Sequence, residues 1–322
     1  MQGPKVSIVI PAYNASNYLS EAIDSALAQT YPNVEVVVVN DGSPDDGATR
    51  AVALSYGDRI RYVEKENGGS SSALNVGIQN MSGEWFSWLS HDDLYAPDKL
   101  LVQMQYLESL ALSADEIQNH VFFAGSNLID ADGKVIREPN EKQLLAIERE
   151  LSLMKTNAEL VAEPTKYLFH GCSCLIHKSV FERIGAFDEQ LRLLNDVDMW
   201  YRIYTNGFTV HFIPKRLVSG RVHAKQVSRS IGYSYHNPEQ DMFWERALEW
   251  LKASVPENEA LLFRFGRNAY LKTRNREGDQ AFALISLAQP EKKFQLTVLK
   301  LFYKIRAGIR TLGKKIYLKI KA

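Results

Sequence analysis

The 322-residue chain lacks a hydrophobic run long enough to cross a membrane, since none approaches the ~20 apolar residues that a spanning helix needs. It has only two cysteines, Cys172 and Cys174, one residue apart and too constrained for an ordinary disulfide. No further cysteine is present to complete a zinc motif. The pair is most simply interpreted as two small core residues. Reduced thiols and the lack of a signal peptide predict a cytoplasmic location.

Two common phosphate-binding motifs are also missing: no Gly-x-Gly-x-x-Gly follows the first predicted strand, and there is no Walker loop. Strand-like and helix-like segments alternate over the first 110 residues, which is typical of a doubly wound parallel sheet with helices on both faces. Strands are predicted at 6–10, 34–39, 60–63, 84–89, 121–124, 172–176 and 208–213. Helices are predicted at 19–27, 70–78, 97–110, 178–184, 196–204 and 238–253, and residues 138–165 read as polar and helical.

Two adjacent carboxylates, Asp92 and Asp93, follow the apolar segment 85–89. Buried unpaired charges are too costly for a core position. The carboxyl end of a strand in an open α/β sheet is where ligands bind. A pair of hard oxygen ligands there suits Mg²⁺ or Mn²⁺ bridging to phosphates. The alternative is a helix-capping turn, because a helix is predicted just after, at Pro97.

Polar and aromatic residues also follow the first two strands. Tyr13 and Asn14 come after the first strand and Asp41 after the second. Parallel strand ends share one edge, so these residues are expected to converge with the Asp92–Asp93 pair. Aromatic stacking, one directional hydrogen bond and a metal would together hold a nucleoside diphosphate. Asp41 taken alone fits an Asx-turn equally well.

With these motifs in place, the chain resembles the inverting glycosyltransferases of family two, which have the GT-A fold. The resemblance covers roughly residues 4 to 230 in the family's order, and it is specific because many blocks agree. The N-terminal blocks are Val6–Asn14, Val39–Ser43, Asn67–Asn75 and His91–Asp93. The later blocks are Gly171–Cys174, Gly185–Glu189, Asn195–Trp200, Arg221–His223 and Gln226–Ser228.

The resemblance implies a role for each matching position. Tyr13 and Asp41 would hold the base of the donor, and Asp92 its ribose or diphosphate. Asp93 would bind the divalent metal, Mn²⁺ or Mg²⁺. Asp196 would be the catalytic base. The other positions implied in donor binding are Pro11, Ala12, Asn14, Asn75 and His223. In some members the residue matching His223 also approaches the metal; a structural histidine is the alternative.

The basic residues are unevenly distributed. Net charge is zero, yet residues 292–322 contain ten Lys or Arg and no Asp or Glu, which leaves 28 of the 38 basic residues against all 38 acidic ones elsewhere. Apolar residues recur in this tail at steps of three and four, predicting a basic amphipathic helix at an anionic membrane interface. They are Val298, Leu301, Ile305, Ile309, Leu312, Ile316 and Ile320. The alternative is a helix docked on the protein itself.

The expected organisation is a glycosyltransferase domain over 1–230, divided into a nucleotide-sugar half (1–110) and an acceptor half (111–230). A helical extension (231–290) and the basic tail (291–322) follow. The expected function is metal-dependent, inverting transfer from a nucleotide-diphosphate sugar, with uracil as the leading base and thymine or guanine left open. The acceptor would be a hydroxyl of a glycan or lipid-linked molecule in cell-surface polysaccharide synthesis, at the cytoplasmic face of the membrane. Nucleic acid is not an expected partner. The alternatives are a non-catalytic nucleotide- or glycan-binding scaffold and a sugar nucleotidyltransferase.

Overall fold

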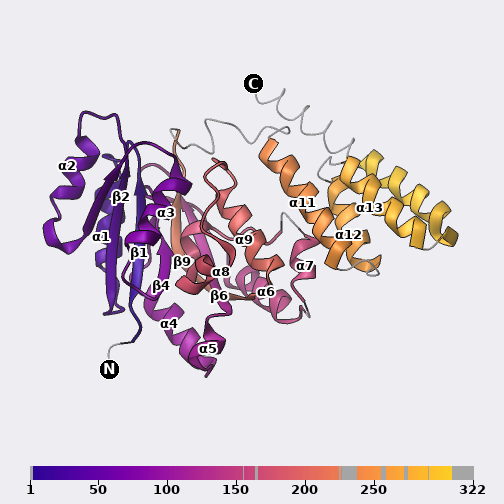
Figure 1. The fold of residues 1–322 in the computed structure, drawn as a ribbon, viewed down its shortest axis with the longest axis horizontal. Helices are drawn as coiled ribbons and strands as arrows, with labels where there is room; N and C mark the ends of the chain where they lie inside the picture. The colour runs from indigo at the N-terminus through magenta and orange to yellow at the C-terminus, as the bar shows by residue number, and fades with distance from the viewer. Residues whose placement is uncertain are drawn as a thin grey trace. The chain divides into compact units, whose positions relative to one another are not determined.

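The computed structural model divides into two compact units. The first comprises Met1–Met154 with Phe169–Ser234, and the second Lys155–Leu168 with Tyr235–Ala322 (Figure 1). The structure describes residues 3–154, 156–163, 166–224, 226, 238–254, 259–271, 275–288 and 290–306. The sequence-derived boundaries at residues 110, 230 and 290 stay predictions.

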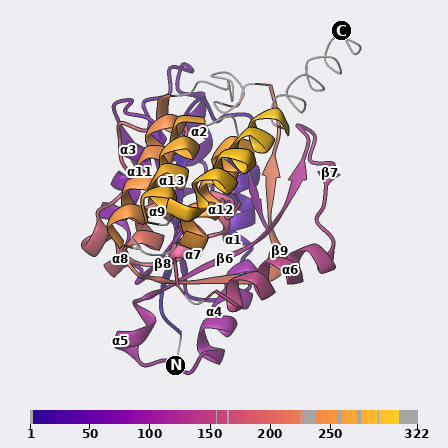
Figure 2. The same ribbon diagram turned by 90° about the vertical axis from the view of Figure 1, so that its right-hand side faces the viewer.

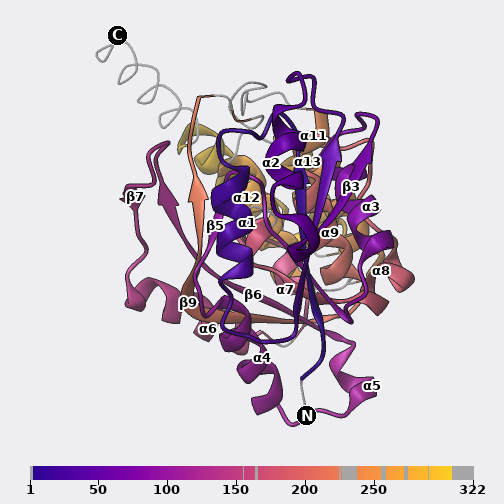
Figure 3. The same cartoon turned by 90° about the vertical axis from the view of Figure 1, so that its left-hand side faces the viewer.

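A mixed sheet forms the centre of the first unit, with strand order β3-β2-β1-β4-β8-β6-β9-β5 and β7 paired to β6. Its N-terminal half is parallel, as the alternating pattern predicts. The parallel strands are β1 (Val6–Ala12), β2 (Val34–Asp41), β3 (Arg61–Lys65) and β4 (Trp85–Trp88) (Figure 3). All of β1 and β4 is buried, which explains their continuous apolar character.

The other half of the sheet contains antiparallel pairings. β8 runs antiparallel to both β4 and β6, and β5 antiparallel to β9, whereas β6 and β9 are parallel. Their bounds are β5 Leu94–Tyr95, β6 His120–Ile129, β7 Val135–Arg137, β8 Leu175–His177 and β9 Thr209–Arg221. In Figure 2, β7 lies at the edge of this half of the sheet. The whole is the α/β arrangement expected for the GT-A fold.

Amphipathic helices pack against the sheet. In α1, the predicted apolar face is buried at Leu19, Ala22, Ile23 and Ala26. Helix α3 approaches β1 so closely that a Cβ on Gly77 would lie 2.1 Å from Val9 Cγ1. The helices of this unit are α1 Leu19–Leu27, α2 Ala48–Leu54, α3 Ser70–Asn80, α4 Lys99–Ser109, α5 Ala114–Ile117, α6 Glu141–Ser152, α8 Lys178–Ile184 and α9 Asn195–Thr205. Short 3₁₀ turns occur at Gly57–Arg59 and Gly171–Ser173.

Three sequence-based strand predictions need correction. The segment expected as a strand from 172 begins instead as the 3₁₀ turn Gly171–Ser173, because the His170 side chain accepts the Cys172 N–H and caps that turn. Strands β6 and β9 are also much longer than 121–124 and 208–213, since they pair in parallel from His120–Thr209 to Ile129–Arg221. This long pairing carries Arg221 to the ligand-binding edge. Most of the predicted flap at 219–238 lies outside the described residues.

The second unit is helical. Its core contains Trp244, Leu248, Phe265, Tyr270 and Phe282, all buried. The elements are α7 Ala158–Val161, α11 Pro238–Ser254, α12 Glu259–Leu271, α13 Asn275–Ala288 and the 3₁₀ turn Pro290–Lys292. Residues 293–306 are helical as well, whereas the predicted positions 309–320 lie outside the described residues. Of the helices described, none has the length and apolarity to cross a membrane.

Lys99 is fully buried beneath β4. Its Nζ donates to Ser87 Oγ (2.8 Å), Gln103 Oε1 (2.9 Å) and the Cys174 carbonyl oxygen (3.4 Å), and it lies 4.2 Å from the centroid of the Tyr95 ring. None of these three acceptors carries a charge. Burial therefore lowers the pKa of Lys99 to about 7.

We predict that this lysine makes stability depend on pH. The unfolded chain keeps the Lys99 proton up to the ordinary pKa of 10.5, while the folded chain releases it near pH 7. Stability contributed by neutral Lys99 therefore rises with pH across that window, by about 1.4 kcal/mol per pH unit. Urea unfolding at pH 7, 8 and 9 should show wild-type protein gaining on Lys99→Met at each step. For Lys178→Met, at an exposed position, the difference in the free energy of unfolding from wild type should not change with pH. If the difference for Lys99→Met is also constant from pH 7 to 9, the prediction is wrong.

Candidate functional site

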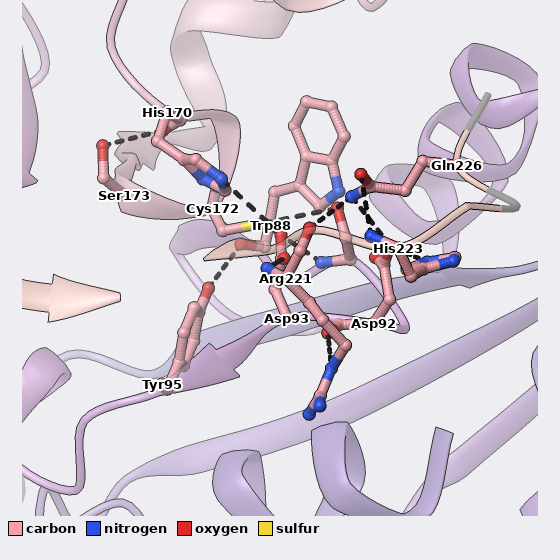
Figure 4. Close-up of polar contacts among 11 residues, drawn as sticks. Trp88, Asp92, Asp93, Tyr95, His170, Cys172, Ser173, Arg221, His223 and Gln226 are labelled. Atoms are coloured by element: carbon pink, nitrogen blue, oxygen red, sulfur yellow. Dashed lines mark hydrogen bonds and ion pairs between the residues drawn. The ribbon is translucent and has the colours of Figure 1, made fainter. Parts of the chain in front are cut away.

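The Asp92–Asp93 pair lies at the carboxyl edge of the sheet, directly after β4, and both residues are buried (Figure 4). Asp93 Oδ1 accepts the backbone N–H of Arg221 at 2.8 Å, while Oδ2 accepts the Cys172 thiol at 3.1 Å. His170 Nε2 lies 3.8 Å from the same Oδ2. Burial raises the pKa of Asp93, with the Asp92 charge adding to it and His170 opposing it. The Asp93 carboxylate is thus held in place, but its surroundings only partly stabilise its negative charge.

Arg221, the last residue of β9, joins three parts of the site. Besides its backbone bond to Asp93, its Nε donates to the Asp92 carbonyl oxygen (2.8 Å) and its Nη2 to Glu21 Oε2 of α1 (2.7 Å). Its side chain is only 1% exposed, and the guanidinium lies 4.5 Å from the Tyr18 ring centroid. Arg221 therefore fixes the end of β9 to the turn after β4 and to α1.

The Asp92 carboxylate faces a histidine. Its Oδ2 lies 3.0 Å from His223 Nε2 and 3.4 Å from Gln226 Nε2. The His223 ring also contacts the Tyr18 ring, with centroids 5.1 Å apart. The structure thus pairs His223 with Asp92, the residue implied in ribose or diphosphate binding.

Asp41 ends β2 and is buried. Its Oδ1 accepts Lys65 Nζ (2.7 Å) and the Gly68 N–H (2.9 Å), and its Oδ2 accepts the Gly69 N–H (2.7 Å). These contacts order the loop that precedes α3.

The end of β1 carries the remaining N-terminal candidates. Pro11 and Ala12 are the last residues of the strand and are buried. Tyr13 follows with 41% of its surface exposed, as expected of a ring available for stacking. Asn14 has a positive φ of 49° and its N–H donates to Ser43 Oγ, which joins this turn to the one after β2.

Asn75 is occupied by protein contacts. Its Nδ2 donates to the Phe187 carbonyl oxygen and to Glu189 Oε1, and its Oδ1 accepts the Phe187 N–H, each at 2.9 Å. The side chain fastens α3 to the loop before α9. To contact the donor as predicted, the Asn75 side chain would have to give up its hydrogen bonds to Phe187 and Glu189, or act indirectly by positioning this loop.

Asp196 lies in the first turn of α9, where the helix dipole favours a negative charge. Its Oδ1 accepts the Val197 N–H at 2.7 Å. Burial raises the pKa of Asp196 to about 6, although the Val197 N–H and the charge of His170 lower it. A carboxylate with this pKa is a stronger base than an exposed one and still ionised at pH 7.

The residues around Asp93 fit a divalent metal. One ligand atom each from Asp93, His170 and Cys172 lies within 4.8 Å of the others. A carboxylate, an imidazole and a thiol are all metal ligands in proteins. The role of Asp93 as a metal ligand, which the family resemblance implies, stays a prediction.

Sequence reasoning missed three members of this site. The sequence indicates no role for Arg221 beyond its place in a motif block, and none for His170. It predicts that Cys172 is a core residue; Cys172 is indeed buried, and it also donates a hydrogen bond to Asp93. Their partners lie 128, 79 and 77 positions away along the chain, so no local pattern marks them. The signal in the sequence that could have pointed to these residues is their closeness to Gly171 and His223, which belong to the motif blocks.

The chain was compared with known proteins. Residues 7–185 match the family model described as glycosyl transferase family 2. A glycosyltransferase of Rickettsia typhi is 37% identical over 331 residues, covering 98% of this chain and 95% of that protein. One of Rickettsia felis is 46% identical over 248 residues, covering 77% of this chain but only 39% of that longer protein. The chain therefore belongs to glycosyl transferase family 2, a family of enzymes.

Similarity to a solved structure agrees on the fold. The crystal structure of S. aureus TarS 1-349 in complex with UDP-GlcNAc superposes with a TM-score of 0.62 at 16% identity, covering 94% of this chain and 89% of that one. At this identity the likeness establishes the fold alone. It confirms the GT-A expectation.

We predict that Arg221 is required for the site to keep its shape. Arg221→Lys keeps a positive charge but cannot reach the acceptors that the planar guanidinium serves. We expect a loss of about 2–4 kcal/mol in the free energy of unfolding, because buried acceptors are left unpaired. Urea unfolding measures it. Arg216→Lys is the matched control on the same strand: its ion pair with Glu138 is exposed, so its loss should stay within about 1 kcal/mol. Equal losses would contradict this role.

Proposed function

We propose that the protein is a metal-dependent, inverting glycosyltransferase that uses a nucleotide-diphosphate sugar, with a UDP-sugar as the leading donor. The observation that carries the proposal is that one family 2 domain brings the buried carboxylate Asp93, next to Asp92, and the helix-borne carboxylate Asp196 within electrostatic reach of the same histidine, His170. The UDP-GlcNAc bound by TarS supports a uracil nucleotide.

In the proposed reaction, Asp196 takes the proton of the acceptor hydroxyl as its oxygen attacks the anomeric carbon of the donor sugar. The new bond forms as the bond from that carbon to the diphosphate oxygen breaks, which inverts the configuration in one displacement. Asp93 would hold a Mg²⁺ or Mn²⁺ ion, whose charge stabilises the departing nucleoside diphosphate. Tyr13 would stack on the base, while Asp41 keeps the base-side loop in place.

The donor site and the base are separable by substitution. Asp196→Asn preserves size and should leave UDP binding intact while lowering transfer by about 10²–10⁴-fold, the usual contribution of a general base. Asp93→Ala should lose metal-dependent UDP binding. Thermal shift with UDP, GDP, dTDP and CDP, with and without Mn²⁺, measures binding, and release of UDP from UDP-GlcNAc measures turnover. Asp132→Asn, in an exposed turn, is the control.

Each outcome discriminates among the candidate functions. Binding of UDP without any turnover that depends on Asp196 would favour a nucleotide-binding scaffold. Failure of all four nucleotides to bind would contradict the donor site. Turnover that releases pyrophosphate would instead indicate a nucleotidyltransferase.

We also propose that the acceptor is a lipid-linked or cell-surface glycan, reached through contact of the second unit with an anionic membrane. Helix 293–306 buries Leu296, and Lys300 and Lys304 bind Asp279 of α13 at 2.6 and 3.2 Å. Five apolar side chains remain exposed on it, by 52% to 81%: Phe294, Val298, Leu301, Phe302 and Ile305. This stripe includes three of the predicted membrane-facing positions. The docked-helix alternative is supported, over the described part of the tail, by the face that carries Leu296, Lys300 and Lys304.

We predict that this stripe supports membrane binding. Replacing Phe294, Leu301 and Ile305 by Ser should abolish co-sedimentation with vesicles that contain anionic phospholipid. The substitutions remove apolar side chains that would insert into the membrane, and they leave all ten cations of the tail in place. The matched control replaces Leu54, Ile136 and Leu153, which are exposed by 54%, 54% and 69% in the first unit. Equal binding by both triple variants, or no binding by wild-type protein, would refute membrane contact through this helix.

A further inference from the structure

We propose that Asn195 is a positioning residue, which ties the proposed base Asp196 to the donor-side loop before α3 and so aligns its carboxylate with the reacting sugar. The inference rests on the proposed function and deepens it. Asn195 is the first residue of α9, directly before Asp196, and Ser70 is the first residue of α3, directly after the loop that Asp41 orders (Figure 3). One hydrogen bond joins the starts of these two helices.

The Asn195 side chain makes one contact on each side. Its Oδ1 accepts the Asp196 N–H at 3.0 Å, and its Nδ2 donates to Ser70 Oγ at 3.2 Å. Because an N–H must face an oxygen, the first contact fixes the orientation of the amide and leaves Nδ2 for Ser70. Asn195 is only 5% exposed, so little water competes for these bonds. The side chain therefore connects the backbone of the proposed base to α3.

A short series of hydrogen bonds runs from the donor side of the site to the base. The Asp41 carboxylate accepts the N–H groups of the two glycines that precede Ser70. Ser70 then binds Asn195, and Asn195 binds the N–H of Asp196. Alignment of reacting groups matters, because a misplacement of roughly 1 Å can cost about 100-fold in rate. The connection through Asn195 would supply this alignment.

A neighbouring serine of α3 makes a similar bond that leads away from the base. Ser71 is buried, and its Oγ donates to the Leu191 carbonyl oxygen, in the loop before α9, at 3.1 Å. Loss of either serine hydroxyl removes one hydrogen bond between α3 and this part of the chain. Of the two bonds, the one from Ser70 leads to the residue beside Asp196. Substitution of the two serines therefore separates a loss of packing from a loss of alignment.

Release of UDP from UDP-GlcNAc and UDP binding by thermal shift test the proposal on the full-length protein. Asn195→Ala should lower kcat by about 10- to 100-fold, while KM for the donor and UDP binding change by less than about threefold. Ser70→Ala should also lower kcat. The double variant should be no slower than Asn195→Ala alone, because both substitutions remove the same connection. Ser71→Ala is the matched control and should keep the wild-type kcat.

Asn195→Asp tests whether a residue of the same shape restores turnover. The Ser70 hydroxyl can donate to the new carboxylate, so both hydrogen bonds are kept. The added charge raises the pKa of Asp196 above its value of about 6. We expect kcat at pH 9 to stay within about threefold of wild type, with the acid limb of the kcat profile moved to higher pH. The other titratable groups that act on Asp196 are unchanged in this variant: His170, Cys174 and Tyr204.

Several results would overturn the positioning role. They are a wild-type kcat in Asn195→Ala, UDP binding that falls in step with kcat, an equal loss in Ser71→Ala, and an Asn195→Asp variant as slow at pH 9 as Asn195→Ala. If Asn195→Ala does not fold, Ser70→Ala and Asn195→Asp decide the question. Asp196→Asn is measured alongside. A slow Asp196→Asn beside a fully active Asn195→Ala rejects the positioning role alone, whereas wild-type turnover in Asp196→Asn rejects the proposed function.

Discussion

The ligand-binding edge of this protein depends on how Arg221 ends strand β9. Its backbone N–H holds Asp93, its guanidinium holds the Asp92 carbonyl oxygen, and its outer nitrogen reaches Glu21 of α1. A buried guanidinium is tolerated only when its donors find acceptors with good geometry, and here the surrounding acceptors supply them. The same contacts therefore satisfy the arginine and hold the Asp93 carboxylate and the Asp92 backbone in place. Stability and site geometry are coupled at one residue.

That coupling arises from the sheet topology. β9 lies parallel to β6 over its whole length and passes a register irregularity at Ala124–Gly125 before reaching Arg221. A shorter strand, as the apolar pattern predicts, would end at Ile213 and leave the edge without its arginine. The turn Gly171–Ser173 meets the same edge from another direction, bringing His170 and Cys172 to Asp93. These two distant segments complete the site at the edge where β4 ends.

The N-terminal half could be predicted from the sequence because its signals are local. Continuous β-branched runs, as in Val36–Val39 of β2, are typical of doubly buried parallel strands, and the polar residues after them identify the shared edge. The second half lacks such signals. The last part of β9 contains Pro214, Lys215 and Arg216, which interrupt any apolar period. Contacts across 79 or 128 positions are decided by packing and leave no periodic pattern.

The free site is electrostatically incomplete. Asp93 and Asp196 are two carboxylates whose pKa values burial raises, and backbone N–H donors offset only part of the cost of their charge. His170 lies near both carboxylates, and a protonated His170 would lower the pKa of each. A bound cation at Asp93 would remove the larger part of this cost, whereas Asp196 must keep enough basicity to accept a proton. In the proposed reaction the two carboxylates differ in role because they differ in surroundings: Asp93 lies against a thiol and the end of β9, and Asp196 lies at the start of a helix. Cation binding and proton acceptance would then follow from where the fold places two chemically identical side chains.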